Sequence, residues 1–325
     1  AVSETAKSKT KSKTKTVGMV LAVVGTVTFS SNVIAEYTAG GGSSNNNTGI
    51  AIGQGSNGSA QVGTNGAEAI AIGATTRANG SQSTAIGNDI TAGGDQAVVI
   101  GSNFNANMTT SSGKGGVAIG SGLTTALDSP VANGTGSLAL GSSGDNTTIN
   151  GTKYDQNGAV ASGAYSAALM TGASATADRS IAFGVGAQTS AVDTIALGTG
   201  TRVGENSSRS IALGERAAVA KNASQSVAIG SVATVGENSS RSIAFGEGAT
   251  IASNISQSLA IGSGAVVNGD QSVALGNNLN AAGNSSVAIG GDDLDKVAST
   301  FTIDDINKAT GTAATKNQTL NNTTS

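Results

Sequence analysis

The amino-acid sequence contains no histidine and no cysteine, so the side chains that most often act as bases, nucleophiles and metal ligands are missing. Ser-His-Asp and Cys-His nucleophile systems are excluded, and so are the usual zinc, copper and haem sites. Carboxylates, lysines and serines remain, but none stands in a spacing typical of a catalytic or metal-binding motif. We therefore expect a protein that is not an enzyme and that uses no cofactor and no metal ion.

Charged residues in a duplicated segment could contact a ligand instead. Residues 202–230 and 234–262 are identical at 21 of 29 positions, and both contain the sequence Gly-Glu-Asn-Ser-Ser-Arg. One interpretation is a repeated charged ridge that binds a ligand. The other, which we favour, is a local Glu–Arg pair in an exposed turn, worth about 0–1 kcal/mol. The candidate contact residues here are Glu205, Arg209, Glu237 and Arg241.

A second group of candidates lies in an insertion between repeats, at residues 145–158. Lys153, Tyr154 and Asp155 stand together there, and Tyr165 follows closely. Only 2% of the residues are aromatic, and an aromatic side chain on a protruding loop is a typical contact residue. The alternative is a loop that packs over the end of a neighbouring repeat.

The overall composition favours a thin, repetitive fold. The chain has 325 residues, of which 38% are hydrophobic, 48 are glycine and one is proline. Most of the hydrophobic residues are small, so they cannot fill a wide globular core. The hydrophobic content is nevertheless too high, and the net charge of −3 too low, for intrinsic disorder.

Residues 1–35 have the pattern of a secretory signal region that is truncated at its start. Five lysines alternate with serine and threonine over residues 7–15, and an apolar run of about a dozen residues follows from Val17 to Phe29. We expect cleavage after Ala35, with secretion of the remaining chain. The remaining chain then carries 12 basic and 19 acidic residues, and this net charge of −7 disfavours nucleic acid as a partner.

A tetrapeptide repeat determines the predicted architecture. A large aliphatic residue, a small residue, a second large apolar residue and glycine recur in fourteen copies between Ile50 and Gly290, and Ala167–Met170 is a degenerate fifteenth copy. The spacing between copies is most often 14 or 16 residues, and longer spacings contain insertions. Apolar residues at i and i+2 predict a strand, and a second short segment follows before a polar turn. The sequence predicts an all-β parallel β-solenoid of about fifteen coils, with insertions at turns.

Alternation along each strand places two sets of side chains on opposite faces. We expect the aliphatic pairs to point into the coil, and the alanine and the preceding serine to point outward. A long face of small uncharged residues would promote aggregation in water, so we expect several copies to pack this face around a common axis. The trimer face, so named because the family resemblance implies three copies with C3 symmetry, consists of Ser210, Ala212, Ser226, Ala228, Ser242 and Ala244.

The repeated Ser-Val/Ile-Ala-Ile/Leu/Phe-Gly motif resembles the head of trimeric autotransporter adhesins, the YadA-like surface fibres of Gram-negative bacteria. The resemblance covers about residues 50–290 and implies a left-handed parallel β-roll, a homotrimer and display on the outer membrane, above a stalk and a C-terminal anchor. Residues 1–15 resemble the end of the extended signal region of these proteins, and residues 290–298 resemble the opening of an insert found in some heads. We expect a signal region at 1–35, a linker at 36–48, the head at 49–291, and the start of an insert or connector at 292–325.

The predicted function is that of an adhesin head. It would attach to host extracellular matrix (collagen, fibronectin or laminin), to cells or to abiotic surfaces, through many weak contacts along the solenoid. The alternatives are an ice-binding solenoid and a purely structural one. An ice-binding face needs a regular threonine array, and threonine is scattered here. A hexapeptide acyltransferase is excluded because its period of six and its usual histidine base are both missing.

Overall fold

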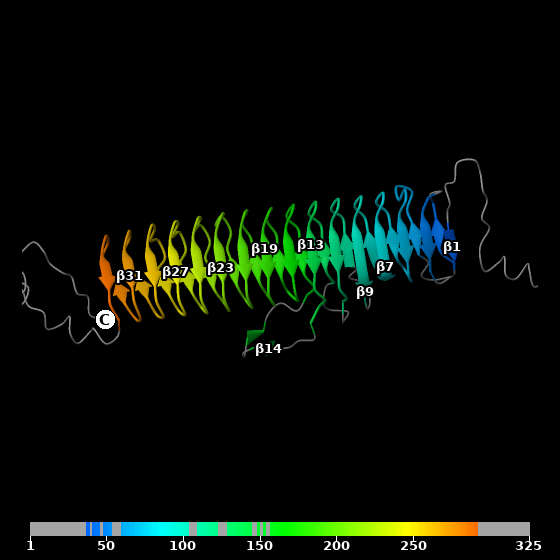
Figure 1. Ribbon diagram of the computed structural model, residues 1–325. Coiled ribbons are helices and arrows are strands. Elements are labelled where there is room, and N and C mark those ends of the chain that lie inside the picture. Colours follow the sequence, from blue (N-terminus) through cyan, green and yellow to red (C-terminus); the bar gives the residue numbers. More distant parts are fainter. Residues whose placement is uncertain are drawn as a thin grey trace, which may run out of the picture. The chain divides into compact units, whose positions relative to one another are not determined.

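The computed structural model describes residues 37–39, 41–45, 48–53, 60–103, 109–122, 129–144, 148–149, 152–153 and 157–291. The regular elements in these ranges are strands, and the chain divides into two compact units, residues 1–145 and 146–325. In each unit two parallel sheets take strands alternately along the chain (Figure 1). The motif sheet holds the tetrapeptide strands, and the return sheet holds the strands between them. The predicted all-β parallel β-solenoid is confirmed.

The first unit contains seven strands of the motif sheet and six of the return sheet. Its motif strands are β1 (Tyr37–Ala39), β3 (Ile50–Ile52), β5 (Ile70–Ile72), β7 (Thr84–Asn88), β9 (Val98–Ser102), β11 (Val117–Ile119) and β13 (Leu138–Leu140). Its return strands are β2 (Ser43–Ser44), β4 (Gln61–Val62), β6 (Arg77–Ala78), β8 (Ile90–Ala92), β10 (Thr109–Ser111) and β12 (Val131–Ala132).

The second unit contains nine strands of each sheet. The motif strands are β17 (Ala167–Leu169), β19 (Ile181–Phe183), β21 (Ile195–Leu197), β23 (Ile211–Leu213), β25 (Val227–Ile229), β27 (Ile243–Phe245), β29 (Leu259–Ile261), β31 (Val273–Leu275) and β33 (Val287–Ile289). The return strands are β16 (Val160–Ala161), β18 (Ser174–Ala175), β20 (Gln188–Thr189), β22 (Arg202–Val203), β24 (Ala218–Val219), β26 (Thr234–Val235), β28 (Thr250–Ile251), β30 (Val266–Val267) and β32 (Asn280–Ala281). An antiparallel hairpin joins β14 (Thr148–Ile149) to β15 (Thr152–Lys153).

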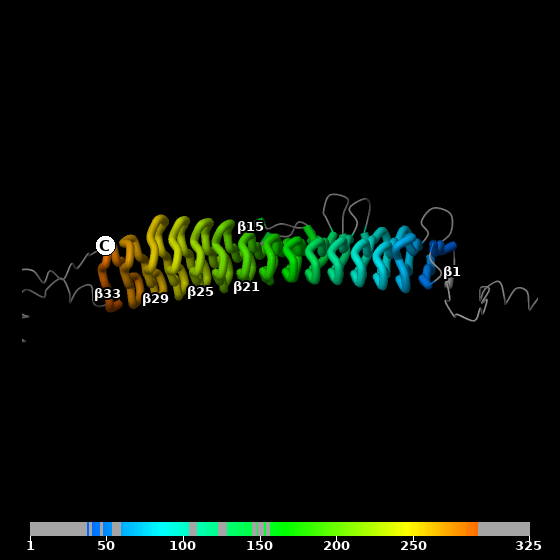
Figure 2. Tube along the Cα trace, turned by 90° about the horizontal axis from the view of Figure 1, so that it is seen from above, coloured from blue at the N-terminus to red at the C-terminus, as the bar shows by residue number. Residues whose placement is uncertain are grey.

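Each coil places its residues in register with the same positions of the next coil. In the motif sheet, Ile211 pairs with Val227, Ala212 with Ala228, and Leu213 with Ile229. Within each unit the tube in Figure 2 shows the coils as successive narrow turns. Because the register repeats, every position of the coil forms a continuous row along the unit.

Residues 36–48, which we expected to be a linker, contain the first pair of strands. β1 pairs with β3 and β2 pairs with β4, so the solenoid begins before the first recognised tetrapeptide. The expected signal region at 1–35 and the expected insert or connector at 292–325 lie outside the described residues.

The prediction that the aliphatic pairs point into the coil is wrong. Ala212, Ala228 and Ala244 are 0% exposed, whereas Ile211 and Leu213 are 38% and 37% exposed. The serines that precede the motif are also buried, so none of the residues of the predicted trimer face lies on the surface. The buried residues in question are Ser210, Ala212, Ser226, Ala228, Ser242 and Ala244, each 0% exposed.

The reason is the narrow cross-section of the coil. The alanine row of the motif sheet belongs to one core cluster with Val219, Val235 and Ile251 of the return sheet. In these coils the return sheet contributes the larger side chain of the core, and the motif sheet adds a methyl group. Interiors are close-packed, and two opposed rows of isoleucine and leucine would not fit.

The buried serines form a hydrogen-bonded row of their own. The hydroxyl of Ser210 donates to the carbonyl of Ala223 (3.1 Å) and accepts from the backbone N–H of Ser226 (3.0 Å). The hydroxyl of Ser226 in turn donates to the carbonyl of Ser239 (3.1 Å) and accepts from the N–H of Ser242 (3.2 Å). Each hydroxyl therefore connects two coils, which offsets the cost of burying it.

The glycine that closes the motif lies where the chain turns against the next coil. Gly230 has φ +130°, and a Cβ placed on it would lie 2.2 Å from the carbonyl oxygen of Gly246. A side chain is excluded at such a position. In the degenerate copy, Met170 occupies the position of this glycine. Its φ is 85°, which is lower than the φ of Gly230.

We predict that Ala228→Leu destabilises the fold, because the added atoms overpack the core between the two sheets. The expected cost of about 1–3 kcal/mol lowers the midpoint of thermal unfolding by roughly 3–10 °C. The matched control is Ala218→Leu, on the outer side of the return strand β24. Circular dichroism should show an almost unchanged midpoint for the control, and equal midpoints for the two variants would contradict the assignment of faces.

Candidate functional site

The outer side of the motif sheet is a continuous apolar surface. Two rows of mostly large side chains, one from the first and one from the third residue of each strand, lie on this side, and nine of them in the second unit are 37–50% exposed. We define the aliphatic face as these residues: Ile181, Phe183, Ile195, Leu197, Ile211, Leu213, Ile243, Phe245 and Ile261. A surface of this kind in a soluble protein marks an interaction site.

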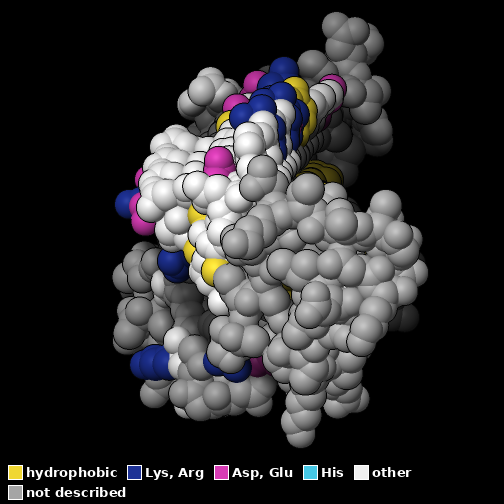
Figure 3. Space-filling model, turned by 90° about the vertical axis from the view of Figure 1, so that its left-hand side faces the viewer, with side chains coloured by type: hydrophobic (Ala, Val, Ile, Leu, Met, Phe, Trp, Pro, Cys, Tyr) yellow, Lys and Arg dark blue, Asp and Glu magenta, His cyan; other side chains and the backbone are white. Residues whose placement is uncertain are grey.

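The turn before each motif strand carries a row of polar, outward-pointing residues. Each has a positive φ, between 52° and 59°, which directs its side chain away from the coil. We define the turn row as Tyr165, Arg179, Asp193, Arg209, Gln225, Arg241, Gln257 and Gln271, and all of them are exposed. Figure 3 shows Lys and Arg side chains gathered along a ridge of the molecule.

Some neighbouring residues of the turn row form hydrogen bonds with each other through their side chains. Arg179 Nε donates to Asp193 Oδ1 (2.6 Å), and its terminal nitrogen Nη2 donates to Asp193 Oδ2 (3.1 Å). The hydrogen bond from Arg179 lowers the pKa of Asp193, and the same bond raises the pKa of Arg179. Gln271 donates to Gln257 in the same way (3.0 Å).

Asparagines form a second row in the coils of 16 residues. Asn206, Asn222, Asn238 and Asn254 all have a positive φ, and the side-chain amide of each donates to the next at 2.9–3.1 Å. The two additional residues of these coils therefore lie in the turn, as predicted for insertions. A backbone with positive φ tolerates asparagine better than most residues.

The structure places the charged candidates of the duplicated segment at one turn but does not pair them as expected. Arg209 and Arg241 belong to the turn row, and both are exposed, as is Glu205. Glu237 forms its ion pair with Lys221 of the preceding coil (Nζ to Oε1, 2.5 Å). Among the described residues no ion pair joins Glu205 to Arg209 or Glu237 to Arg241, so the local pair is replaced by contacts between coils.

The candidates in the insertion are only partly described. Lys153 is exposed in β15, whereas Tyr154 and Asp155 lie outside the described residues. Tyr165 is 68% exposed at the start of the turn row. The tyrosine ring is therefore available for contacts at the surface.

The aliphatic face was not predicted as a surface. The alternation of the tetrapeptide indicates which residues share a face, but not which face is inside. The size of the side chains could have predicted the aliphatic face. The tetrapeptide has the order large, small, large, and the interior of a 14-residue coil is narrow enough to favour the small residue.

These surfaces can bind by contact area and hydrogen bonding. In the part of the chain that the structure describes, no group of three or more Asp and Glu side chains is arranged to hold a metal ion. The described segments also contain no helix long and apolar enough to cross a membrane.

A comparison with protein families matches residues 65–89, 175–201 and 256–278 to the YadA head domain repeat. The chain contains YadA head domain repeats. The matched segments include β5 and β6 in the first unit and β19 and β20 in the second. No curated protein sequence matches the chain. The YadA head repeat and the solenoid indicate an adhesin-type surface protein rather than an enzyme.

We predict that Arg179→Gln raises the pKa of Asp193 toward the ordinary value of an aspartate, because the guanidinium hydrogen bond is lost. In the unmodified protein the lowered pKa favours the folded state above the pKa of unfolded aspartate, and this contribution is lost as pH falls through the folded pKa. Both side chains are about half exposed, so the effect on stability is small.

The measurement is an NMR titration of the Asp193 carboxyl carbon. Arg202→Gln, on the return sheet, serves as the control and should leave the pKa of Asp193 unchanged. An Asp193 that titrates at the same pH with and without Arg179 would contradict the ion pair.

Proposed function

We propose that the YadA head repeats of this chain assemble into a homotrimer in which three aliphatic faces meet around a common axis. The supporting observation is the exposure of Leu213, Phe245 and the other residues of the aliphatic face, although they are the largest apolar residues of the motif. A flat, regular face that is identical in each copy suits C3 symmetry.

Burial of this face would contribute a large part of the stability. A large aliphatic side chain gains roughly 1.5–3 kcal/mol on full burial, so covering the exposed third or more of each one adds roughly 0.5–1 kcal/mol. The core of a single coil is alanine, serine and valine, which by themselves bury little apolar surface. The trimer supplies the burial that one chain cannot.

The same arrangement would leave the return sheet and the turn row on the outside. We propose that these surfaces make the head an adhesin, displayed on the bacterial outer membrane after secretion across the inner membrane. The ligands would be extracellular matrix proteins (collagen, fibronectin or laminin), cells or abiotic surfaces. Three equal faces with many weak contacts raise avidity by about 10²–10⁴ over one contact.

The outward residues of the return sheet do not favour the ice-binding alternative. In the second unit this row includes Gln188, Arg202, Ala218, Thr234 and Thr250. A row that mixes charged, amide and methyl groups offers no regular threonine array.

We predict that the double variant Leu213→Glu, Phe245→Glu dissociates the trimer, because it places six carboxylates in an apolar interface at a cost of several kcal/mol. The matched control is Ala218→Glu, Thr250→Glu, which puts the same charges on the return sheet. Sedimentation should show the unmodified protein and the control at three times the chain mass of 31.1 kDa, and the double variant at one chain mass. A monomeric unmodified protein would contradict the proposed assembly.

We predict that adhesion depends on the number of coils. Deletion of residues 202–233 removes one copy of the duplication and leaves Thr234–Val235 in the place of Arg202–Val203, so the register is kept. Attachment to collagen, fibronectin, laminin and bare plastic should fall in proportion to the surface removed.

Single substitutions test the alternative of one compact contact site. Arg209→Ala, Arg241→Ala and Tyr154→Ala should each reduce attachment less than the deletion does. If one of them abolishes attachment while the trimer remains intact, the distributed model is wrong.

A further inference from the structure

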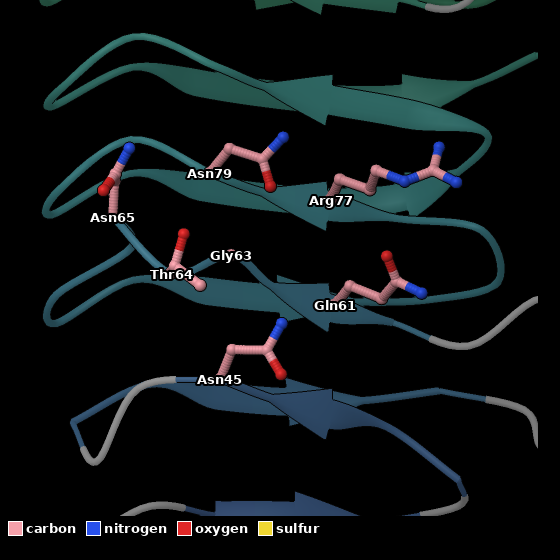
Figure 4. A pocket seen from close by; sticks show the side chains of 7 residues that line it. All are labelled: Asn45, Gln61, Gly63, Thr64, Asn65, Arg77 and Asn79. Carbon is pink, nitrogen blue, oxygen red and sulfur yellow. The ribbon is translucent and has the colours of Figure 1, made fainter.

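A polar hollow lies on the return sheet of the first unit, across β2, β4 and β6 (Figure 4). Its volume is about 450 Å³, and most of the side chains that line it are exposed, so it is an open, shallow site. The hollow lies on the return sheet of its unit and not on the motif sheet, so it stays open when the motif sheets of three copies meet. The inference that follows does not depend on adhesion.

The hollow exists because Gly63 interrupts a row of asparagines. Backbone hydrogen bonds from Asn45 to Val62 (3.0 Å) and from Gly63 to Ala78 (2.9 Å) bring Asn45, Gly63 and Asn79 into one row over adjacent coils. A Cβ on Gly63 would lie 2.5 Å from Asn79 Oδ1, so the asparagine amide occupies the space that a side chain would need. Gly63 therefore lets the Asn79 amide lie close to the backbone, and the amides of Asn45 and Asn79 flank a lower part of the surface at this glycine.

The lining is polar throughout and carries one positive charge. Amide side chains come from Asn45, Gln61, Asn65 and Asn79, and Thr64 adds a hydroxyl. Arg77 contributes its guanidinium, and the described residues that line the hollow include no carboxylate and no aromatic ring. In Figure 4, the side chains of Gln61 and Arg77 extend in the same direction on neighbouring strands.

A comparison within the chain shows that these groups are available for a ligand. Gln61 pairs in register with Arg77, just as Gln188 pairs with Arg202 in the second unit. Arg202 Nη2 donates to Gln188 Oε1 (2.7 Å), so these two side chains contact each other across adjacent coils. Within the described residues, no corresponding bond joins Arg77 to Gln61.

We propose that this hollow binds a carboxylated sugar. The guanidinium of Arg77 can pair with a carboxylate through two parallel hydrogen bonds, and no neighbouring acid in the lining competes for it. The amides of Asn45, Gln61 and Asn79 offer both donors and acceptors, which suits adjacent sugar hydroxyls. The lack of apolar and aromatic lining disfavours a peptide ligand, because peptides are usually anchored by apolar side chains.

The carboxylate is the group that selects the ligand. A neutral sugar in an open polar site exchanges hydrogen bonds to water for equivalent bonds to amides, with little net gain. A charge-assisted pair is stronger, so the acidic sugar binds more tightly. For a shallow site we expect a dissociation constant on the order of 1–10 mM.

The test uses the full chain and two sugars that differ only at one carbon, methyl β-glucuronide and methyl β-glucoside. NMR titration should show binding of the glucuronide at least fivefold tighter than that of the glucoside. Equal affinity for the two sugars, or no binding of the glucuronide at about 50 mM, would overturn the proposal. This comparison needs no variant, so it cannot be confused with a folding defect.

Substitutions then locate the binding. Arg77→Gln should weaken glucuronide binding at least fivefold, and Gly63→Asn should do the same, because the added side chain displaces the Asn79 amide and raises the surface at this position. Arg202→Gln, at the equivalent position of the second unit, should change nothing. If Arg202→Gln weakens binding as much as Arg77→Gln, or if Gly63→Asn leaves it unchanged, the assignment to this hollow is wrong.

Discussion

The width of the coil is the constraint on which the rest of the structure depends. Two sheets built from strands of two to five residues lie so close that, from β22 to β30, the motif sheet contributes alanine where the return sheet contributes valine or isoleucine. This distance decides which residues are buried, because a close-packed interior admits no second row of large side chains. The side chains of the large residues of the tetrapeptide therefore point away from the core of the coil.

Exposed aliphatic rows and a weak single-chain core are two results of the same constraint. A chain that buries mostly alanine and serine gains little from its own core, and it presents its larger apolar groups to the solvent. Association of several copies through that face removes both disadvantages. The fold, the proposed trimer and the outward position of the polar rows thus follow from one geometric limit.

The order of strands was predictable from the sequence, but the inside and the outside of the coil were not. Copies such as Ile211–Gly214 predict strands, coil length and the position of insertions because the spacing is regular. The period of two places Ala212 opposite Ile211 and Leu213 without stating which is buried. Strand β1 was missed because Tyr37-Thr38-Ala39-Gly40 departs from the aliphatic-alanine composition of the later copies.

Features that depend on contacts between coils could also not be predicted from the sequence. The pairing of Glu237 with Lys221 requires the register of 16-residue coils, and a reading of the turn alone suggests Arg241 instead. The hollow at Gly63 requires three coils in register, and the neighbouring motif glycines Gly53 and Gly73 are 20 residues apart. Irregular spacing hides which residues become neighbours.

Cysteine crosslinking tests the central claim most directly, since the chain has no cysteine of its own. Single variants Leu213→Cys, Ala212→Cys and Thr234→Cys place a thiol on the aliphatic face, in the core and on the return sheet. Under mild oxidation the account predicts disulfide-linked dimers of Leu213→Cys alone, with no reaction of Ala212→Cys in the folded protein. Crosslinked Ala212→Cys, together with unreactive Leu213→Cys, would contradict the account.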